Sequence, residues 1–173
     1  LWAYDIPVCV HTKLSPDLLM RLGRDGIIDG VKDSSGDDVA FRWLCRANEA
    51  AGHPLQLLTG HEVVVDGAYM SGADGSVPGL ANVDPEGYVR QWQAYERRDW
   101  EAVRTEQDRL AELMRIVQVK GVQGFGAGVG AFKAALHLLG VFDSPEMPRP
   151  VAAIEGDNME HVASVLRAVD LLS

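Results

Sequence analysis

The chain has 173 residues, of which 47% are hydrophobic and 24% are charged, and its formal net charge is −9. This length and apolar content favour one globular unit with a buried core and exclude a disordered chain. The acidic balance excludes a nucleic-acid binder, because such proteins concentrate basic residues on one surface. No apolar run approaches the roughly 18 residues that a membrane span needs, so we expect a soluble, cytoplasmic protein without a membrane partner.

The residues 1–83 alternate between strand-like and helix-like segments. Ser15 and Pro16 have the chemistry of a helix N-cap and a first helical residue, and Pro7 ends a strand because it lacks an amide donor. The predicted strands are 1–7, 27–32, 55–58 and 75–80. The predicted helices between them are 15–24, 38–51 and 62–71. Strands separated by helices in this way predict an α/β fold with a parallel sheet.

The residues 84–173 are predicted to be helical. The expected helices are 85–97, 100–119, 130–139 and 158–172. The prolines before the last helix are ordinary loop punctuation. We therefore predict two regions, 1–83 with the strands and 84–173 with the helices.

A glycine-rich segment, 124–130, resembles a loop that binds a dinucleotide. That fingerprint requires a strand before it and an acidic residue about 20 residues further on, at the end of the next strand. A long predicted helix precedes this segment and a proline-rich stretch follows it. We therefore reject nucleotide binding and predict a flexible loop between helices, near the mouth of an active site.

Cysteine and histidine residues give no sign of a metal site. Cys9 and Cys45 lack CxxC spacing, and the histidines lack HExxH or paired-carboxylate spacing. We expect two reduced thiols, no metal and no cofactor.

The stretch Gly30–Asp37, GVKDSSGD, places Lys32 at the end of a predicted strand that opens into a turn. Two interpretations are open from these residues alone. Lys32 either extends its ammonium to solvent at a strand terminus or carries chemistry there. Ser34 and Ser35 are predicted to be turn residues rather than catalysts.

Several short motifs occur in a fixed order along the chain. They are Tyr4-Asp5-Ile6-Pro7, Gly30-Val31-Lys32-Asp33, Leu58-Thr59-Gly60, Gly72-Ala73-Asp74-Gly75-Ser76-Val77, Ala81-Asn82-Val83 and Phe132-Lys133-Ala134-Ala135-Leu136. Over nearly its whole length, the chain resembles the dihydrodipicolinate synthase/N-acetylneuraminate lyase family of pyruvate-dependent aldolases and lyases that form Schiff bases.

The resemblance implies a (β/α)8 TIM barrel followed by a helical bundle, assembled as a homo-oligomer that is a dimer of dimers. By that comparison, the chain holds strands 5 to 8 of the barrel and then the helical region. The loop that binds the keto acid carboxylate in the family belongs to the other half, which these residues do not contain. We therefore expect the working protein to include an N-terminal half of the barrel as a partner of this half.

The resemblance also implies catalytic roles for Lys32 and Tyr4. Lys32 would form an imine with C2 of pyruvate or of a 2-keto sugar acid, which requires a deprotonated amine in an enclosed site. Tyr4 would carry protons to and from the substrate. In the alternative interpretation, Tyr4 has its ring in the core and its hydroxyl bound to a backbone carbonyl.

Four further residues are expected around the substrate by the same resemblance. Dihydrodipicolinate synthases have an arginine at the position of Cys9, and a thiol cannot make the bidentate contact of a guanidinium with a carboxylate. Gly60 is expected to line the substrate site, and Glu62, shortly after it, matches a place where sugar-acid members bind substrate hydroxyls, although a glutamate here also suits the first turn of a helix. Val77 matches a residue whose carbonyl faces the active site.

These residues favour a lyase or aldolase that acts on a 2-keto acid, most consistently one derived from a sugar. The alternatives are a 4-hydroxy-tetrahydrodipicolinate synthase, which the loss of arginine at Cys9 disfavours, and a non-catalytic oligomeric or ligand-binding relative.

Overall fold

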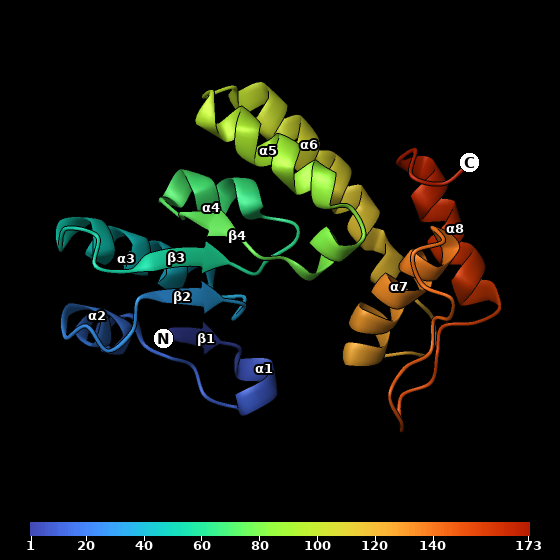
Figure 1. Ribbon diagram of the computed structural model, residues 1–173, viewed down its shortest axis with the longest axis horizontal. Helices are drawn as coiled ribbons and strands as arrows, with labels where there is room; N and C mark the ends of the chain where they lie inside the picture. Colours follow the sequence, from blue (N-terminus) through green and yellow to red (C-terminus); the bar gives the residue numbers. More distant parts are fainter.

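Four parallel strands form a single sheet in the order β1-β2-β3-β4 (Figure 1). The computed structural model describes residues 1–173 apart from the side chain of Phe125. The strands are β1 (Trp2–Asp5), β2 (Gly30–Asp33), β3 (Gln56–Thr59) and β4 (Gly75–Ser76). The predicted parallel sheet is therefore confirmed.

One longer helix joins each strand to the next and covers the sheet. These helices are α2 (Pro16–Arg24), α3 (Asp38–Ala50) and α4 (Val65–Ser71). As predicted, α2 begins at Pro16, and the Ser15 hydroxyl accepts a hydrogen bond from the Leu18 amide at 3.3 Å. Val31 and Leu57 on the central strands are fully buried in one hydrophobic cluster with residues of the helices. Each such side chain contributes about 1.5–3 kcal/mol of transfer free energy.

Prolines make two of the predicted strands shorter than expected. The first strand was predicted to reach Pro7, but Pro7 is the first residue of a short helix, α1 (Pro7–Val10), a position where proline needs no amide partner. The predicted strand 75–80 has only two ladder residues. Pro78 has no amide to donate, and a 3-10 helix, η1 (Gly79–Asn82), follows it.

Two further boundaries differ from the prediction. The second strand begins at Gly30 rather than at residue 27, because Gly26 has a positive φ of 66° and the chain is still turning there. The helix predicted from residue 62 begins at Val65, so that residues 60–64 form a loop after β3.

The C-terminal region is helical, as predicted. It contains α5 (Pro85–Glu96), α6 (Trp100–Leu113), η2 (Met114–Val117), α7 (Phe125–Leu138) and α8 (Asp157–Ala168). The predicted helix 100–119 corresponds to α6 and its 3-10 extension η2. Figure 1 shows α5 and α6 as a hairpin beside α4, with α7 and α8 on the side toward which the strand arrows point. None of the described helices is long and apolar enough to cross a membrane.

The prediction of a flexible glycine-rich loop is wrong, because residues 125–130 form the first turns of α7. The glycines permit close packing there. A Cβ on Gly126 would lie 2.8 Å from Val122 Cγ1, and one on Gly130 would lie 3.4 Å from Ile154 Cγ1. Only Gly124, just before the helix, has the positive φ that a glycine-specific turn requires.

A polar network joins the start of α5 to α6. Asp84 caps α5 by accepting a hydrogen bond from the Gly87 amide at 3.0 Å, and it forms an ion pair with Arg109. Arg109 also donates from Nε to Glu106 Oε1 at 2.8 Å. Partial burial lowers the pKa of Arg109, but its bonds to Asp84 and Glu106 outweigh that effect and raise the pKa. The network therefore holds the start of α5 against α6.

Candidate active site

Tyr4 and Lys32 lie side by side near the carboxyl ends of β1 and β2. The parallel register pairs these two residues, and their side chains leave the sheet on the same face. Lys32 Nζ donates a hydrogen bond to the Tyr4 hydroxyl at 3.0 Å and lies 4.1 Å from the centre of the Tyr4 ring. Tyr4 is 48% exposed, so the interpretation of Tyr4 as a core residue bound to a backbone carbonyl is wrong.

The two residues that follow this pair, Asp5 and Asp33, point to the opposite face of the sheet. They are 0% and 6% exposed. Lys13, from the loop between α1 and α2, forms ion pairs with both carboxylates, and the Nζ–Oδ2 distance to Asp33 is 3.5 Å. Partial burial lowers the pKa of Lys13, but the hydrogen bond to Asp5 and the charge of Asp33 outweigh this effect and raise it.

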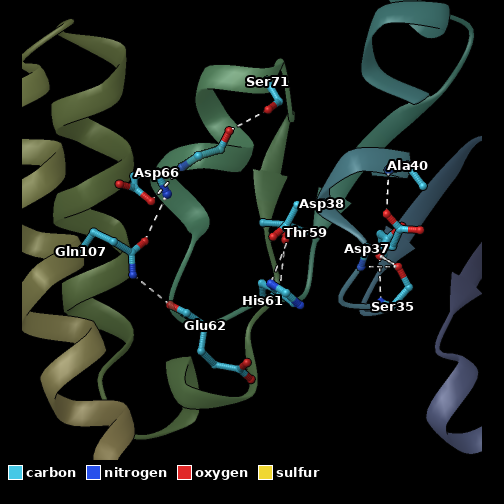
Figure 2. A network of polar contacts seen from close by, with 12 residues as sticks. Ser35, Asp37, Asp38, Ala40, Thr59, His61, Glu62, Asp66, Ser71 and Gln107 are labelled. Atoms are coloured by element: carbon cyan, nitrogen blue, oxygen red, sulfur yellow. Dashed lines mark hydrogen bonds and ion pairs between the residues drawn. The ribbon is translucent and has the colours of Figure 1, made fainter. Parts of the chain in front are cut away.

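The loop after Lys32 is held by hydrogen bonds of its own. Asp33 Oδ1 accepts from the amide of Ser35 at 2.8 Å and from its hydroxyl at 2.7 Å, so Ser35 is a turn residue as predicted. The Ser35 hydroxyl accepts from the Asp37 amide at 3.2 Å, and Asp37 caps α3 (Figure 2). The sequence after the lysine thus connects β2 rigidly to the next helix.

Gly60 lies directly against Lys32. Its amide donates to the Asp33 carbonyl at 2.6 Å, which extends the pairing of β2 and β3 by one residue. A Cβ at Gly60 would lie 2.0 Å from Ser34 Oγ and 3.0 Å from Lys32 Cε. Only glycine fits this position without displacing its neighbours.

Glu62 links the loop after β3 to η1, α5 and α6 by hydrogen bonds. Its Oε1 accepts a hydrogen bond from the Gly79 amide, and its carbonyl accepts from Tyr88 Oη and Gln107 Nε2, each at 3.1 Å. Figure 2 shows Glu62 between Gln107 and the segment with Thr59, at the end of β3, and His61, in the loop after it. Since α4 begins at Val65, the interpretation of Glu62 as a residue of the first helical turn is wrong.

Cys9 and Val77 lie on the loops and short helix that follow their strands. Cys9 is an exposed free thiol on α1, just beyond β1. Val77 follows β4 directly, and its amide donates to the Thr59 carbonyl at 2.8 Å. The structure therefore brings Lys32, Tyr4 and Gly60 together, whereas Cys9, Glu62 and Val77 follow three different strands and, in the described part of the chain, form no hydrogen bond with Lys32 or Tyr4.

Lys13 is the residue that sequence reasoning missed. Asp5 and Asp33 carried a signal, because a residue next to Tyr4 or Lys32 in a strand must point to the other face. Lys13 carried none, since it lies in a loop and its approach to both carboxylates depends on the path of the chain after α1.

Metal-binding side chains do not gather anywhere in the described part of the chain. No group of three or more His, Cys, Asp or Glu side chains there is placed to hold a metal ion. His53 instead pairs with Asp74 at 2.9 Å, and His61 lies 3.5 Å from Asp38.

Comparisons with known proteins agree with the order of the motifs. The chain is 31% identical over 173 residues to an uncharacterized DapA-like lyase of Halobacterium salinarum, and the match covers 99% of this chain and 53% of that protein. It is 25% identical over 167 residues to a 4-hydroxy-tetrahydrodipicolinate synthase of Methanosphaerula palustris, covering 96% and 54%. The chain thus spans about half the length of these relatives.

Solved structures and a family model complete the comparison. The dihydrodipicolinate synthase of Bacteroides thetaiotaomicron superposes with a TM-score of 0.87 at 27% identity, over 97% of this chain and 55% of that structure. The model of the Dihydrodipicolinate synthetase family matches residues 2–169. With this match over almost its whole length, the chain belongs to the Dihydrodipicolinate synthetase family.

Proposed function

We propose that the chain carries the catalytic lysine of a lyase or aldolase that forms a Schiff base with a 2-keto acid. The observation that supports this most directly is the 3.0 Å hydrogen bond between Lys32 Nζ and the Tyr4 hydroxyl at the carboxyl ends of two parallel strands. A nucleophile in contact with a proton carrier is the arrangement that imine chemistry needs.

The proposed reaction starts with attack of the neutral Lys32 amine on the C2 carbonyl. The C2 oxygen takes one proton from the attacking amine and one from Tyr4 and leaves as water, so that a protonated imine and a tyrosinate remain. The tyrosinate then takes the proton of the C4 hydroxyl. The C3–C4 bond breaks, its electron pair moves toward the imine nitrogen, and an aldehyde leaves. Tyr4 returns the proton to C3 of the enamine, and hydrolysis releases pyruvate and the free amine. Condensation is the reverse sequence.

We also propose that residues 1–83 form strands 5 to 8 of a (β/α)8 barrel and that residues 84–173 form its C-terminal helical region. The open four-stranded parallel sheet supports this assignment, since both outer strands, β1 and β4, have a free edge. The 55% coverage of a dihydrodipicolinate synthase structure is consistent with it. The functional assays below therefore use the full-length polypeptide with both halves.

A 2-keto acid derived from a sugar is the proposed substrate. Cys9 cannot supply the bidentate cation that a second substrate carboxylate would need. Glu62 supplies a carboxylate that suits hydroxyl groups, and only its Oε1 is used by Gly79. The second candidate, 4-hydroxy-tetrahydrodipicolinate synthase, is favoured by the similarity to the enzyme of that name from Methanosphaerula palustris.

Contact between copies of the protein is proposed at a groove between α3 and α4. This groove has a volume of about 770 Å³, and its lining includes Val39, Phe41 and Trp43 of α3. Trp43 is 65% exposed, which is unusual for so large an apolar side chain. A second copy that covers the groove would bury it in a homo-oligomer.

Turnover of a substrate panel tests the proposed function. The full-length protein is assayed for pyruvate release from 2-keto-3-deoxy sugar acids, and for condensation of pyruvate with aspartate semialdehyde. We expect pyruvate release, and we expect Lys32→Arg to abolish it because a guanidinium cannot form the imine. Lys120→Met, at an exposed position, is the matched control and should keep full activity. Activity that survives Lys32→Arg would refute the assignment, and condensation alone would favour the second candidate.

A further inference from the structure

We propose that Lys13 is a positioning residue of the active site: by pairing with Asp5 and Asp33, it holds the ends of β1 and β2 so that Tyr4 and Lys32 stay in contact. The inference rests on the proposed function, because it assigns Lys13 a part in the same reaction. Lys13 does not itself meet the substrate, since its partners point to the face of the sheet opposite Tyr4 and Lys32.

The register of β1 and β2 couples the two faces of the sheet. Tyr4 lies opposite Lys32, and Asp5 lies opposite Asp33, one residue further on. The same pair of strand ends therefore sets two distances. One is between the two carboxylates on one face of the sheet, and the other is between the phenol and the amine on the opposite face. A change that parts Asp5 from Asp33 also parts Tyr4 from Lys32.

The two buried carboxylates need a compensating cation. Asp5 and Asp33 are 0% and 6% exposed and face each other as like charges on neighbouring strands, which is unfavourable without a cation. Asp33 Oδ2 has no hydrogen-bond partner among the described residues, and its ion pair with Lys13 at 3.5 Å compensates its charge.

Backbone hydrogen bonds tie the Lys13 loop to β1 and β1 to the end of β2. Asp5 Oδ1 accepts from the Leu14 amide at 3.2 Å, and Lys13 Nζ also donates to the Leu14 carbonyl at 3.3 Å. On the other side, the Ser34 amide donates to the Asp5 carbonyl at 2.9 Å. Lys13 thus closes a ring of contacts that runs from β1 through its own loop to β2. A displacement of a reacting group by about 1 Å can cost about 100-fold in rate.

The experiment measures how fast the full-length protein forms its imine with pyruvate. The reaction is quenched with borohydride at set times, and the modified fraction is measured by intact-protein mass spectrometry. Wild type is compared with Lys13→Met, which keeps the stem and removes the charge, and with Lys13→Arg, which keeps the charge. Lys120→Met is the control for loss of an exposed lysine. The double variant Asp5→Asn/Lys13→Met also lacks the ion pairs of Lys13, but it leaves only the Asp33 carboxylate buried without a cation. Thermal unfolding shows which variants fold.

We expect Lys13→Met to slow imine formation at saturating pyruvate at least tenfold, while the pyruvate concentration for half-maximal rate stays within threefold. Lys13→Arg should restore the rate to within threefold of wild type, and Lys120→Met should match wild type. A folded Lys13→Met variant with a rate within twofold of wild type would overturn the inference. If Lys13→Met does not fold, the same limits apply to the double variant. A rate at least tenfold below that of wild type supports the inference, and a folded double variant with a rate within twofold of wild type overturns it. A wild-type protein that forms no adduct would instead refute the proposed function.

Discussion

Gly60→Ala should disturb Lys32 directly, because the glycine lies where a methyl group has no room. The added Cβ would be 2.0 Å from Ser34 Oγ, 3.0 Å from Lys32 Cε and 3.2 Å from the Asp33 carbonyl oxygen. Ser34 can rotate its hydroxyl away, but the carbonyl belongs to the strand backbone and Lys32 must shift. Overpacking of this kind costs about 1–3 kcal/mol of the free energy of unfolding.

Urea unfolding and imine trapping on the same preparation check this prediction. Gly67→Ala is the matched control, because a Cβ there meets nothing within 4 Å among the described residues and the position lies inside α4. Replacing glycine by alanine inside a helix should raise the free energy of unfolding by about 0.5–1 kcal/mol. We expect Gly60→Ala to lose stability and to form the imine at least tenfold more slowly. A Gly60→Ala protein as stable and as fast as wild type would refute the packing argument.

Three further predictions concern the thiols, the α5–α6 network and the assembly. Burial, together with the charge of Asp74, raises the pKa of Cys45 to about 11. At pH 8 only about one Cys45 in a thousand is therefore a thiolate, and iodoacetamide should label exposed Cys9 first in a mass-spectrometric time course; equal labelling would contradict this. Asp84→Ala removes the α5 cap and a buried ion-pair partner, so it should lower the free energy of unfolding by about 3 kcal/mol or more. Glu49→Ala, in an exposed ion pair, is the control and should lower it by at most about 1 kcal/mol. Equal losses in urea unfolding would refute this. Trp43→Glu should reduce the particle mass measured by light scattering, and an unchanged mass would exclude the α3–α4 groove as the contact between copies.

The position of Tyr4 beside Lys32 was predictable from the sequence because local rules act on it directly. Motifs with Tyr4 and Lys32 end two predicted strands, and parallel strands bring their carboxyl ends to one edge. The start of α2 was predictable for the same kind of reason, since Ser15 and Pro16 satisfy a helix end without help from distant residues.

The remaining features depend on contacts that a linear sequence does not display. Pro7 is compatible with a strand end and with a helix start, and the chain path after β1 decides for the helix. The glycines of α7 resemble a loop, yet they serve packing against Val122 and Ile154. Lys13 shows the limit most clearly, because a loop lysine becomes part of the site only when β1 and β2 place two carboxylates in its reach.

Trapping of the imine is the measurement that tests the central claim most directly. The full-length protein is incubated with pyruvate and borohydride, its intact mass is measured, and the modified peptide is mapped. The account predicts one reduced pyruvate adduct per chain, located on Lys32, and no adduct in Lys32→Arg. A folded, full-length protein that stays unmodified, or an adduct on another lysine, would contradict the assignment of Lys32 as the nucleophile.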